Sequence, residues 1–387
     1  MPVEVKPVRS AREKNLFIDI EWQINKKTPN WVSPLRMERK KILDTKKNPF
    51  YQHSEIELFI AFKDSKPAGR IAAITNENHN SFHNDKAGFW GFFECVDDQN
   101  VANSLFDAAA DWLRKKEKDH MLGPMNPSTN DECGLLIEGY DTPPFIMMVH
   151  NPTYYPRLVE GYGNAKAKDL YAWYSPTKDA VEQITEKMRR VAGKILNKYN
   201  IRVRNINIKN LEEEIKLIKE VYNNAWSNNF AFVPFTDAEI DAVAADLKPL
   251  ANENLILIAE RDGKPVAFSV TIPNINEVLI KIPNGRLFPT GIFKLLTGLK
   301  KIKTVRVIIL GVIKELQFSG LGSVFYIRTI ENASNLGYIG GEMSWILEDN
   351  HTMNRAIESF GSKRYKTYRI YSYPLEQTVL DALSKHF

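Results

Sequence analysis

The chain has 387 residues, of which 43% are hydrophobic and 26% are charged, so its composition is that of a globular protein and not of a disordered or fibrous one. The length predicts two domains, because a single hydrophobic core seldom serves more than about 250–300 residues. The formal net charge of +5 is too small to indicate a nucleic-acid partner. Only two cysteines occur, and the chain has neither an apolar signal core nor a run of about 18 apolar residues, which predicts a reduced, cytoplasmic protein.

Four short patterns occur twice in the same order, at an offset of about 200 residues, which predicts a duplicated domain. The pairs are Trp31–Pro34 with Phe232–Pro234, Leu58–Pro67 with Leu255–Pro265, Asn151–Thr153 with Asn350–Thr352, and Tyr162–Gly163 with Phe360–Gly361. We therefore predict a first domain over residues 1–174, a linker helix over 175–200 that Ser175 to Thr177 can cap, and a second domain over 201–387.

The second copy reads as an α/β unit in chain order. Asp262-Gly263 lies between two apolar runs and predicts a tight hairpin. Residues 305–312 form an apolar, mostly β-branched run, typical of a strand that is buried on both faces. An amphipathic helix follows from Leu321 and ends before Gly337, then a strand over 343–347, and then a helix from Asn350 to Gly361.

Between the buried strand and its helix, the segment Gln317–Ser323 carries two glycines. Glycine lets the backbone turn tightly and lets a ligand approach it, and the unpaired N–H groups of a helix start attract anions. Such a loop suits a pyrophosphate. An ordinary strand-to-helix turn is the alternative interpretation, and the glycines alone do not distinguish the two.

The stretch Leu310–Ser323 resembles motif A of the GNAT superfamily of acyl-CoA N-acyltransferases, with Gln317, Gly320 and Gly322 at its fixed positions. The spacing of Asn350 and Gly361 resembles a later motif of the same superfamily. The resemblance implies an α/β fold of two tandem GNAT-like domains, each a mixed twisted sheet flanked by helices, as in large tandem-GNAT proteins of bacteria. It implies acyl-CoA (coenzyme A) as co-substrate, held by Leu310, Gly311, Val312, Gln317, Phe318, Ser319, Gly320, Leu321, Gly322, Ser323 and Asn350.

Two features depart from the family pattern. Lys314 stands where motif A usually has a proline, and Ile357 stands where many members have a tyrosine that acts as general acid. The first copy departs further, because it has Asp97 and Asp98 and no glycine where the phosphate loop would lie. We predict that this copy does not bind the cofactor and instead walls the acceptor site or holds the second copy.

In the mechanism that the resemblance implies, an amine attacks the thioester directly. A main-chain N–H near Leu310–Val312 would hold the thioester oxygen, and Asn350 would contact the pantetheine or the leaving sulfur. Glu342, at the start of the next strand, is the candidate base. The alternative for Glu342 is a solvated carboxylate at a strand end.

Two segments are candidates for binding the acceptor. One is the polar loop 123–134, with Asn126, Asn130 and Glu132, and the other is the segment 224–234, which resembles the acceptor-covering loop of the superfamily and contains Trp226 and Phe232. Cys133 is better explained as a buried cysteine than as a nucleophile. No metal site is predicted from the seven histidines.

The second copy also carries an insertion between its third and fourth strands. Residues 278–314 contain no acid, and lysines and arginines alternate there with apolar side chains. An apolar surface edged by lysines can lie on an anionic membrane or accept a lipid. It can equally cover the core while its lysines remain in water, or pair with the phosphates of the coenzyme.

These patterns predict an acyl-CoA-dependent N-acyltransferase that uses a small-molecule or lipid amine. Two alternatives stay open. One is a non-catalytic CoA-binding or scaffold protein, which the absent helical tyrosine favours and the Gln317–Gly322 loop opposes. The other is N-acylation of a long-chain amine lipid such as a sphingoid base, which the basic apolar insertion favours.

Overall fold

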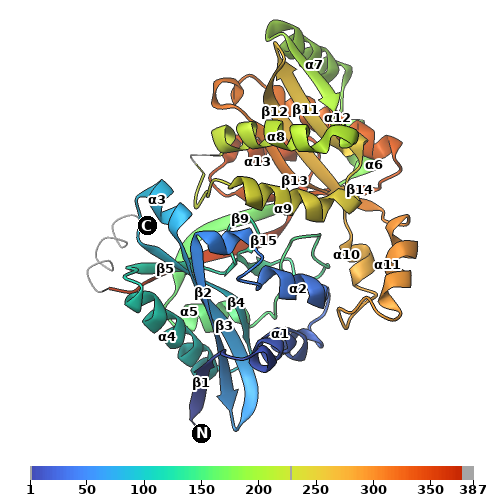
Figure 1. Cartoon of the computed structure of the whole chain (residues 1–387). Coiled ribbons are helices and arrows are strands. Elements are labelled where there is room, and N and C mark those ends of the chain that lie inside the picture. The colour runs from blue at the N-terminus through green and yellow to red at the C-terminus, as the bar shows by residue number, and fades with distance from the viewer. Residues whose placement is uncertain (1, 227–228, 377–387) are drawn as a thin grey trace. The chain divides into compact units, whose positions relative to one another are not determined.

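The computed structural model describes residues 2–226 and 229–376, and contacts divide them into two compact units. Unit 1 comprises residues 2–170, 276–297 and 366–376, and unit 2 comprises residues 171–275 and 298–365. The chain passes between the units four times: inside β9 (Ala165–Pro176), just before α10 (Asn276–Leu279), inside α11 (Gly291–Leu299) and inside β15 (Lys363–Pro374). Each unit has a mixed sheet with helices beside it, which confirms the predicted α/β class (Figure 1).

In unit 1 the sheet order is β1-β2-β3-β4-β5-β15, with β8 also paired to β15. The elements of unit 1 besides β9 and β15 are β1 (Val3–Pro7), α1 (Ala11–Asn25), α2 (Arg36–Ile42), β2 (Ser54–Lys63), β3 (Lys66–Asn76), α3 (Glu77–His83), β4 (Ala87–Cys95), α4 (Gln99–Lys115), β5 (His120–Gly123), β6 (Met125–Asn126), β7 (Glu132–Cys133), β8 (Leu135–Glu138), α5 (Tyr155–Gly161), α10 (Asn276–Leu279) and most of α11 (Gly291–Leu299).

In unit 2 the sheet order is β9-β14-β13-β12-β11-β10. The remaining elements of unit 2 are α6 (Thr177–Gln183), α7 (Glu186–Lys198), β10 (Ile201–Asn205), α8 (Leu211–Ala225), α9 (Asp237–Leu247), β11 (Ile256–Arg261), β12 (Lys264–Pro273), β13 (Thr304–Val312), α12 (Leu321–Asn335), β14 (Gly340–Leu347) and α13 (His351–Ser359). The strands and helices predicted for this copy are therefore confirmed, including the tight hairpin at Asp262-Gly263, where both residues have positive φ.

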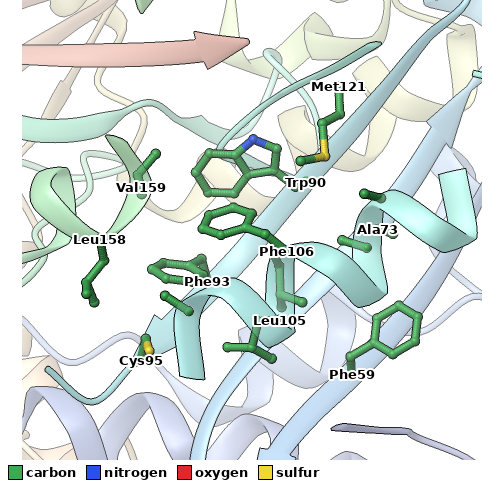
Figure 2. Packing of buried hydrophobic residues seen from close by; sticks show 14 of the residues in the cluster. Phe59, Ala73, Trp90, Phe93, Cys95, Leu105, Phe106, Met121, Leu158 and Val159 are labelled. Carbon is green, nitrogen blue, oxygen red and sulfur yellow. The ribbon is translucent and has the colours of Figure 1, made fainter. Parts of the chain in front are cut away.

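The core of unit 1 lies between its sheet and α4, as Figure 2 shows. Apolar residues recur on α4 every three or four positions, so one face of the helix is apolar along its length. Phe106 on that face lies edge-on to Trp90 and stacks on Phe93, with ring centroids 5.0 Å apart in both pairs. Burial raises the pKa of the Cys95 thiol in this core, and Cys133 is buried too, as predicted for that residue.

The observed grouping differs from the predicted boundaries in two places. The residues 276–297 of the insertion and the last strand group with unit 1, although both lie within the predicted second domain, 201–387. The insertion is anchored there by hydrogen bonds: Arg36 donates its backbone N–H to the Gly285 carbonyl and its Nε to the Asn284 carbonyl, both at 2.9 Å. The linker region is also two helices, α6 and α7, because Thr185 starts a new helix by capping Met188 at 3.2 Å.

Across residues 2–226 and 229–376, none of the helices combines the length and apolar character that crossing a bilayer requires.

Candidate active site

The central feature of unit 2 is an opening between two neighbouring parallel strands. β13 and β14 pair only at their beginnings, from Thr304 to Val307 on β13. Beyond that point β13 stays paired with β12 on its other edge as far as Val312. Within the described part of the chain, residues 308–312 therefore face β14 without a ladder partner. Such an edge can take up an extended chain that carries amide groups, as a sheet takes up a further strand.

A β-bulge lies where the strands part. Ile308 is the extra residue, because its neighbours Val307 and Ile309 pair with consecutive residues of β12. A bulge bends its strand and increases the local twist. It therefore provides a local physical reason for β13 to leave β14 at this point.

The pleat of β13 decides which backbone groups face the opening. Ile313 donates its N–H to the carbonyl of Val266 in β12, at 3.0 Å. Because these groups alternate in direction along an antiparallel ladder, those of Leu310 and Val312 point to the other edge. The Val312 carbonyl accepts a hydrogen bond from Gln317 Nε2 at 3.4 Å, which agrees with that direction.

The predicted phosphate loop joins β13 to α12, and the side chains of the loop leave the space beside Gly322 unfilled. Gly320 has φ 84°, and a Cβ there would lie 2.9 Å from the side chain of Ile195, so glycine suits this position for two reasons. A Cβ at Gly322 would meet nothing within 4 Å. Phe318 is 90% exposed, so its side chain does not fill the turn.

The first turn of α12 leaves backbone donors available. The hydroxyl of Ser319 accepts the N–H of Leu321 at 3.2 Å, and Ser323 donates its N–H to the carbonyl of Gly320 at 3.0 Å. The N–H groups of Gly320 and Gly322 have no acceptor among the described residues. Together with the positive end of the helix dipole, these N–H groups are donors of the kind that bind anions, and the predicted pyrophosphate site stays a prediction.

The end of α8 lies directly against β13. A Cβ at Gly311 would come within 2.2 Å of the Trp226 ring, so the missing side chain is what admits the indole. Trp226 stacks on Tyr222 with centroids 5.0 Å apart and lies 5.8 Å from Phe268. Gln317 Nε2 donates to the carbonyl of the residue before Trp226 at 3.1 Å. The motif glutamine thus fastens α8 to the strand that borders the opening.

Glu342 is fully buried at the closed end of the same opening, where its strand position pairs with Arg306. Ser344 donates its hydroxyl to Glu342 Oε1 at 2.6 Å, and Arg306 Nε lies 3.5 Å from the same oxygen. Tyr365 donates its hydroxyl to Oε2. The alternative of a solvated strand-end carboxylate is therefore wrong, and the role of Glu342 as a base stays a prediction.

Asn350 serves as the N-cap of α13. Its side-chain oxygen accepts the N–H of Met353 at 3.1 Å, and its backbone carbonyl accepts the N–H of Asn354 at 3.0 Å. The position at which the family tyrosine was expected, Ile357, is buried in the same helix. No hydroxyl is available at Ile357, so a general acid must come from elsewhere.

Unit 1 has the counterpart of this opening, but the chain itself fills it. β4 and β5 pair as parallel strands over only three residues, beginning at Ala87. The segment that follows β5 then turns back onto β4: a Cβ at Gly91 would lie 1.6 Å from the Met125 carbonyl oxygen. Asn126 Oδ1 accepts the N–H of Phe92 at 2.6 Å. The edge that is open in unit 2 is therefore occupied in unit 1.

The helix start that follows β4 carries its own anion. The Asp98 carboxylate caps α4 by accepting the N–H groups of Asn100 at 2.9 Å and of Val101 at 3.4 Å, and it pairs with Lys63. These bonds lower the pKa of Asp98, with the Lys63 hydrogen bond as the largest cause. A carboxylate thus already holds the place that an incoming phosphate would need.

The residues predicted to bind the acceptor have internal partners of their own. In unit 1, the Asn130 N–H donates to Ser128 Oγ at 3.1 Å, and Glu132 forms an ion pair with Arg39 at 2.9 Å. In unit 2, Phe232 is buried in the α8 cluster. Of the segment 224–234, residues 227–228 lie outside the described residues. Acceptor binding by these residues stays a prediction.

Sequence reasoning missed a buried ion network in unit 1. Arg39 also pairs with Glu21 at 3.2 Å, and Arg70 pairs with Glu21 at 2.9 Å and lies 3.7 Å from Glu94. Burial, opposed in part by Arg70, raises the pKa of Glu94 to about 7. The network joins α1, β3 and β4, which are far apart in sequence, so no local pattern could have revealed it.

One group in unit 1 bears on the prediction of no metal. Asp85, Asp119 and His120 bring one potential ligand atom each within 4.8 Å of one another, and they are the sole such group among the described residues. His120 Nδ1 already lies 2.6 Å from Asp119, so an ordinary hydrogen bond accounts for that contact. The absence of a metal stays a prediction.

Comparison with known proteins places this geometry in a family. No protein-family model matches the chain. It is 37% identical over 376 residues to the protein named bacterial ceramide synthase of Caulobacter vibrioides, with 95% of this chain and 97% of that protein covered. It is also 37% identical over 373 residues to the protein YghO of Escherichia coli, with 94% of each covered. The chain therefore belongs to the family that contains these two proteins.

The fold of this chain is the tandem GNAT fold. A tandem GNAT protein from the clavulanic acid biosynthesis pathway superposes with a TM-score of 0.55 at 9% identity, over 97% of this chain and 99% of that one. The predicted tandem GNAT fold is therefore confirmed. Enzymes with the GNAT fold use acyl-CoA as co-substrate.

Proposed function

We propose that the protein transfers an acyl group from acyl-CoA to the amine of a long-chain, sphingoid-type base. The observation that carries the proposal is the similarity, along nearly the whole of both chains, to a protein named bacterial ceramide synthase. A ceramide is a long-chain base acylated on nitrogen, so the name denotes amide formation on a lipid amine. The parted strands and open helix start of unit 2 supply a place for the acyl donor.

The donor is proposed to lie along the edge of β13. The amide groups of pantetheine would pair with the backbone of Leu310 and Val312, whose groups face the opening. The pyrophosphate would lie at the start of α12, on the N–H groups of Gly320 and Gly322 and the dipole behind them. At the first place β13 has no ladder partner toward β14, and at the second a Cβ on Gly322 would meet nothing within 4 Å.

The chemistry requires one bond to form and one to break. The neutral amine nitrogen attacks the thioester carbon, the C–N bond forms, the C–S bond breaks, and the nitrogen loses a proton while the thiolate gains one. A main-chain N–H on the free edge of β13 would stabilise the oxyanion of the tetrahedral intermediate. Asn350 would act chiefly by starting α13, although its predicted contact with the pantetheine or the sulfur is compatible with that role.

Glu342 is proposed to position the strands. A base must reach the amine, whereas Glu342 is fully buried and its two oxygens accept from Ser344 and Tyr365. Its pairing with Arg306 links β14 to β13 next to the point of parting. Breaking a buried ion pair costs about 3–5 kcal/mol. Glu342→Gln would therefore lower stability under either role, but loss of a base would also remove the acidic limb of the pH–kcat profile, whereas a positioning role would leave that limb in place.

Unit 1 is proposed to bind no acyl-CoA. Met125 and Asn126 cover the strand edge, and Asp98 holds the helix start. One acyl-CoA per chain is the expected stoichiometry. Calorimetric titration with a non-hydrolysable acyl-CoA analogue measures this number directly, and two equal sites per chain would contradict the assignment.

The proposed reaction is tested by following free thiol and the amide product with palmitoyl-CoA as donor. The acceptors are sphinganine, serinol, which has a similar amino alcohol group without the long chain, and glucosamine. We expect thiol release and a product of the mass of the amide with sphinganine, and much slower turnover with the other two. Equal turnover of serinol would contradict a long-chain acceptor while leaving an N-acyltransferase in place.

A non-catalytic CoA-binding protein is the alternative outcome, and the absence of a hydroxyl at Ile357 is the observation that favours it. Binding of acyl-CoA without thiol release, over amines of all chain lengths, would support that alternative. It would overturn the proposed reaction but not the donor site.

A further inference from the structure

The surface of the insertion is apolar and basic at the same time. Four of its large apolar side chains are strongly exposed: Ile280 (40%), Phe288 (77%), Phe293 (68%) and Leu296 (59%). Single exposed apolar residues are normal on protein surfaces, whereas larger exposed apolar patches mark interaction sites, and these four residues lie within 17 residues of chain. We call these four residues, with the exposed Lys281, Arg286 and Lys294, the basic apolar face.

Part of this face is a helix whose exposed apolar residues are aligned. Phe293 and Leu296 are three positions apart on α11, so they project from the same side of the helix. The buried residues of the insertion, among them Val278 and Ile282, already provide its attachment to unit 1. The exposed side chains are therefore additional to what holds the insertion in place.

The charge of the segment selects the kind of partner. No acidic residue occurs from Val278 to Lys314, and exposed Lys300 and Lys301 follow α11 directly. A protein interface commonly pairs charges of both signs, whereas the surface of an anionic bilayer offers negative charge over a wide area. Each lysine near such a surface raises the partition coefficient of the protein onto the bilayer by about fivefold. Aromatic and leucine side chains enter the headgroup boundary, while lysines stay at its surface.

We propose that the basic apolar face docks the protein on anionic membranes. Resting on the proposed function, this docking would let the enzyme collect a long-chain amine from the bilayer in which it dissolves. The docking uses residues of the insertion and not those of the donor site. It can therefore be measured without acyl-CoA and without turnover.

The binding experiment uses the full chain and vesicles of phosphatidylcholine, with and without phosphatidylglycerol, in a sedimentation assay. We expect binding to the anionic vesicles that weakens with added salt. The double variant Phe293→Ser/Leu296→Ser should lose at least about tenfold in partitioning, because two large apolar groups no longer leave water. Ile339→Ser, which removes a side chain of matched exposure (60%) outside the face, is the control and should bind as the wild type does.

The electrostatic part has its own variant pair. Lys281→Gln/Lys294→Gln, which removes two exposed charges of the face, should lower partitioning to anionic vesicles by about tenfold or more. Lys46→Gln/Lys47→Gln removes the same charge from two exposed neighbours in unit 1 and should change little. Melting temperatures of all variants near the wild-type value show that the fold is kept.

Three results would overturn the inference. The first is failure of the wild type to bind anionic vesicles, and the second is binding by the face variants as strong as that of the wild type. The third is a change in the sedimentation coefficient of the face variants in the absence of lipid, because such a change would show that the face is an interface between copies of the chain. Turnover of sphinganine in detergent without vesicle binding would refute docking alone. Vesicle binding without turnover would refute the reaction alone.

Discussion

Replacing Gly322 with Asp separates the fold from donor binding. Gly322 is the second residue of α12, and a Cβ there meets nothing within 4 Å, so a side chain fits without displacing an atom. Glycine inside a helix costs about 1 kcal/mol relative to alanine, and a carboxylate in the first turn gains about 0.3–1 kcal/mol from the dipole. Gly322→Asp should therefore unfold at the same temperature as the wild type or somewhat higher.

Donor binding should respond in the opposite sense. The new carboxylate would lie about 5 Å from a pyrophosphate at the helix start, and at an effective dielectric constant of about 20 two like charges at that distance repel by about 3 kcal/mol. The dissociation constant for acyl-CoA should rise by about 100-fold. Gly322→Ala is the matched control, since it adds the Cβ without the charge and should bind far more tightly than the Asp variant.

Calorimetric titration and thermal shift with acetyl-CoA and palmitoyl-CoA measure both effects. A ligand at about 100 times its dissociation constant stabilises the wild type by about 2.7 kcal/mol, and this gain should vanish for Gly322→Asp at the same concentration. If Gly322→Asp binds acyl-CoA as tightly as Gly322→Ala, the start of α12 does not hold the pyrophosphate. The donor-site proposal then fails, whatever the activity of the variant.

Two further predictions concern packing and charge. Gly311→Ala places a Cβ 2.2 Å from the Trp226 ring, so the indole must move. We expect the free energy of unfolding, measured in urea, to fall by about 1–3 kcal/mol, and the tryptophan fluorescence to change. An unchanged spectrum would contradict the contact. Burial raises the pKa of Glu94 to about 7, so the folded protein keeps this proton at pH values where the unfolded chain has lost it. The stabilisation that comes from protonated Glu94 is therefore complete below about pH 4.5 and is lost as the pH rises through about 7. Glu94→Gln should remove up to about 3 kcal/mol of that pH dependence, as measured by unfolding at a series of pH values, and an undiminished slope would assign the dependence to another group.

Local patterns were sufficient to predict most elements of unit 2. The hairpin at Asp262-Gly263, the strand at 305–312 and the helix that ends before Gly337 depend on turn residues and on hydrophobic periodicity, which act over a few residues. The family of the donor loop could also be recognised, because its glycines are close together in sequence. The break between α6 and α7 was missed, although Thr185 is a residue type that favours the start of a helix.

The environment of Glu342 was not predictable from its own strand. A carboxylate at the start of a strand is more often solvated, and only the register of β13 against β14 places Arg306 opposite it. The covering of the β4 edge in unit 1 by the segment after β5 was equally unpredictable. Asn126 was identified as a polar loop residue, and its hydrogen bond with Phe92 joins segments 34 residues apart. In both cases strand pairing decides which side chains meet.

The sequence by itself determined the α/β class, the duplication and the glycine loop of the second copy, since each depends on residue type and spacing along the chain. Only the tertiary structure decided that the insertion groups with unit 1, that β13 and β14 part beyond Val307, and that unit 1 fills its own opening. The physical reason is that these features arise from hydrogen bonds and packing between segments that are distant in sequence. Each segment supplies only one of the two partners, so its own residues do not show which partner it will meet.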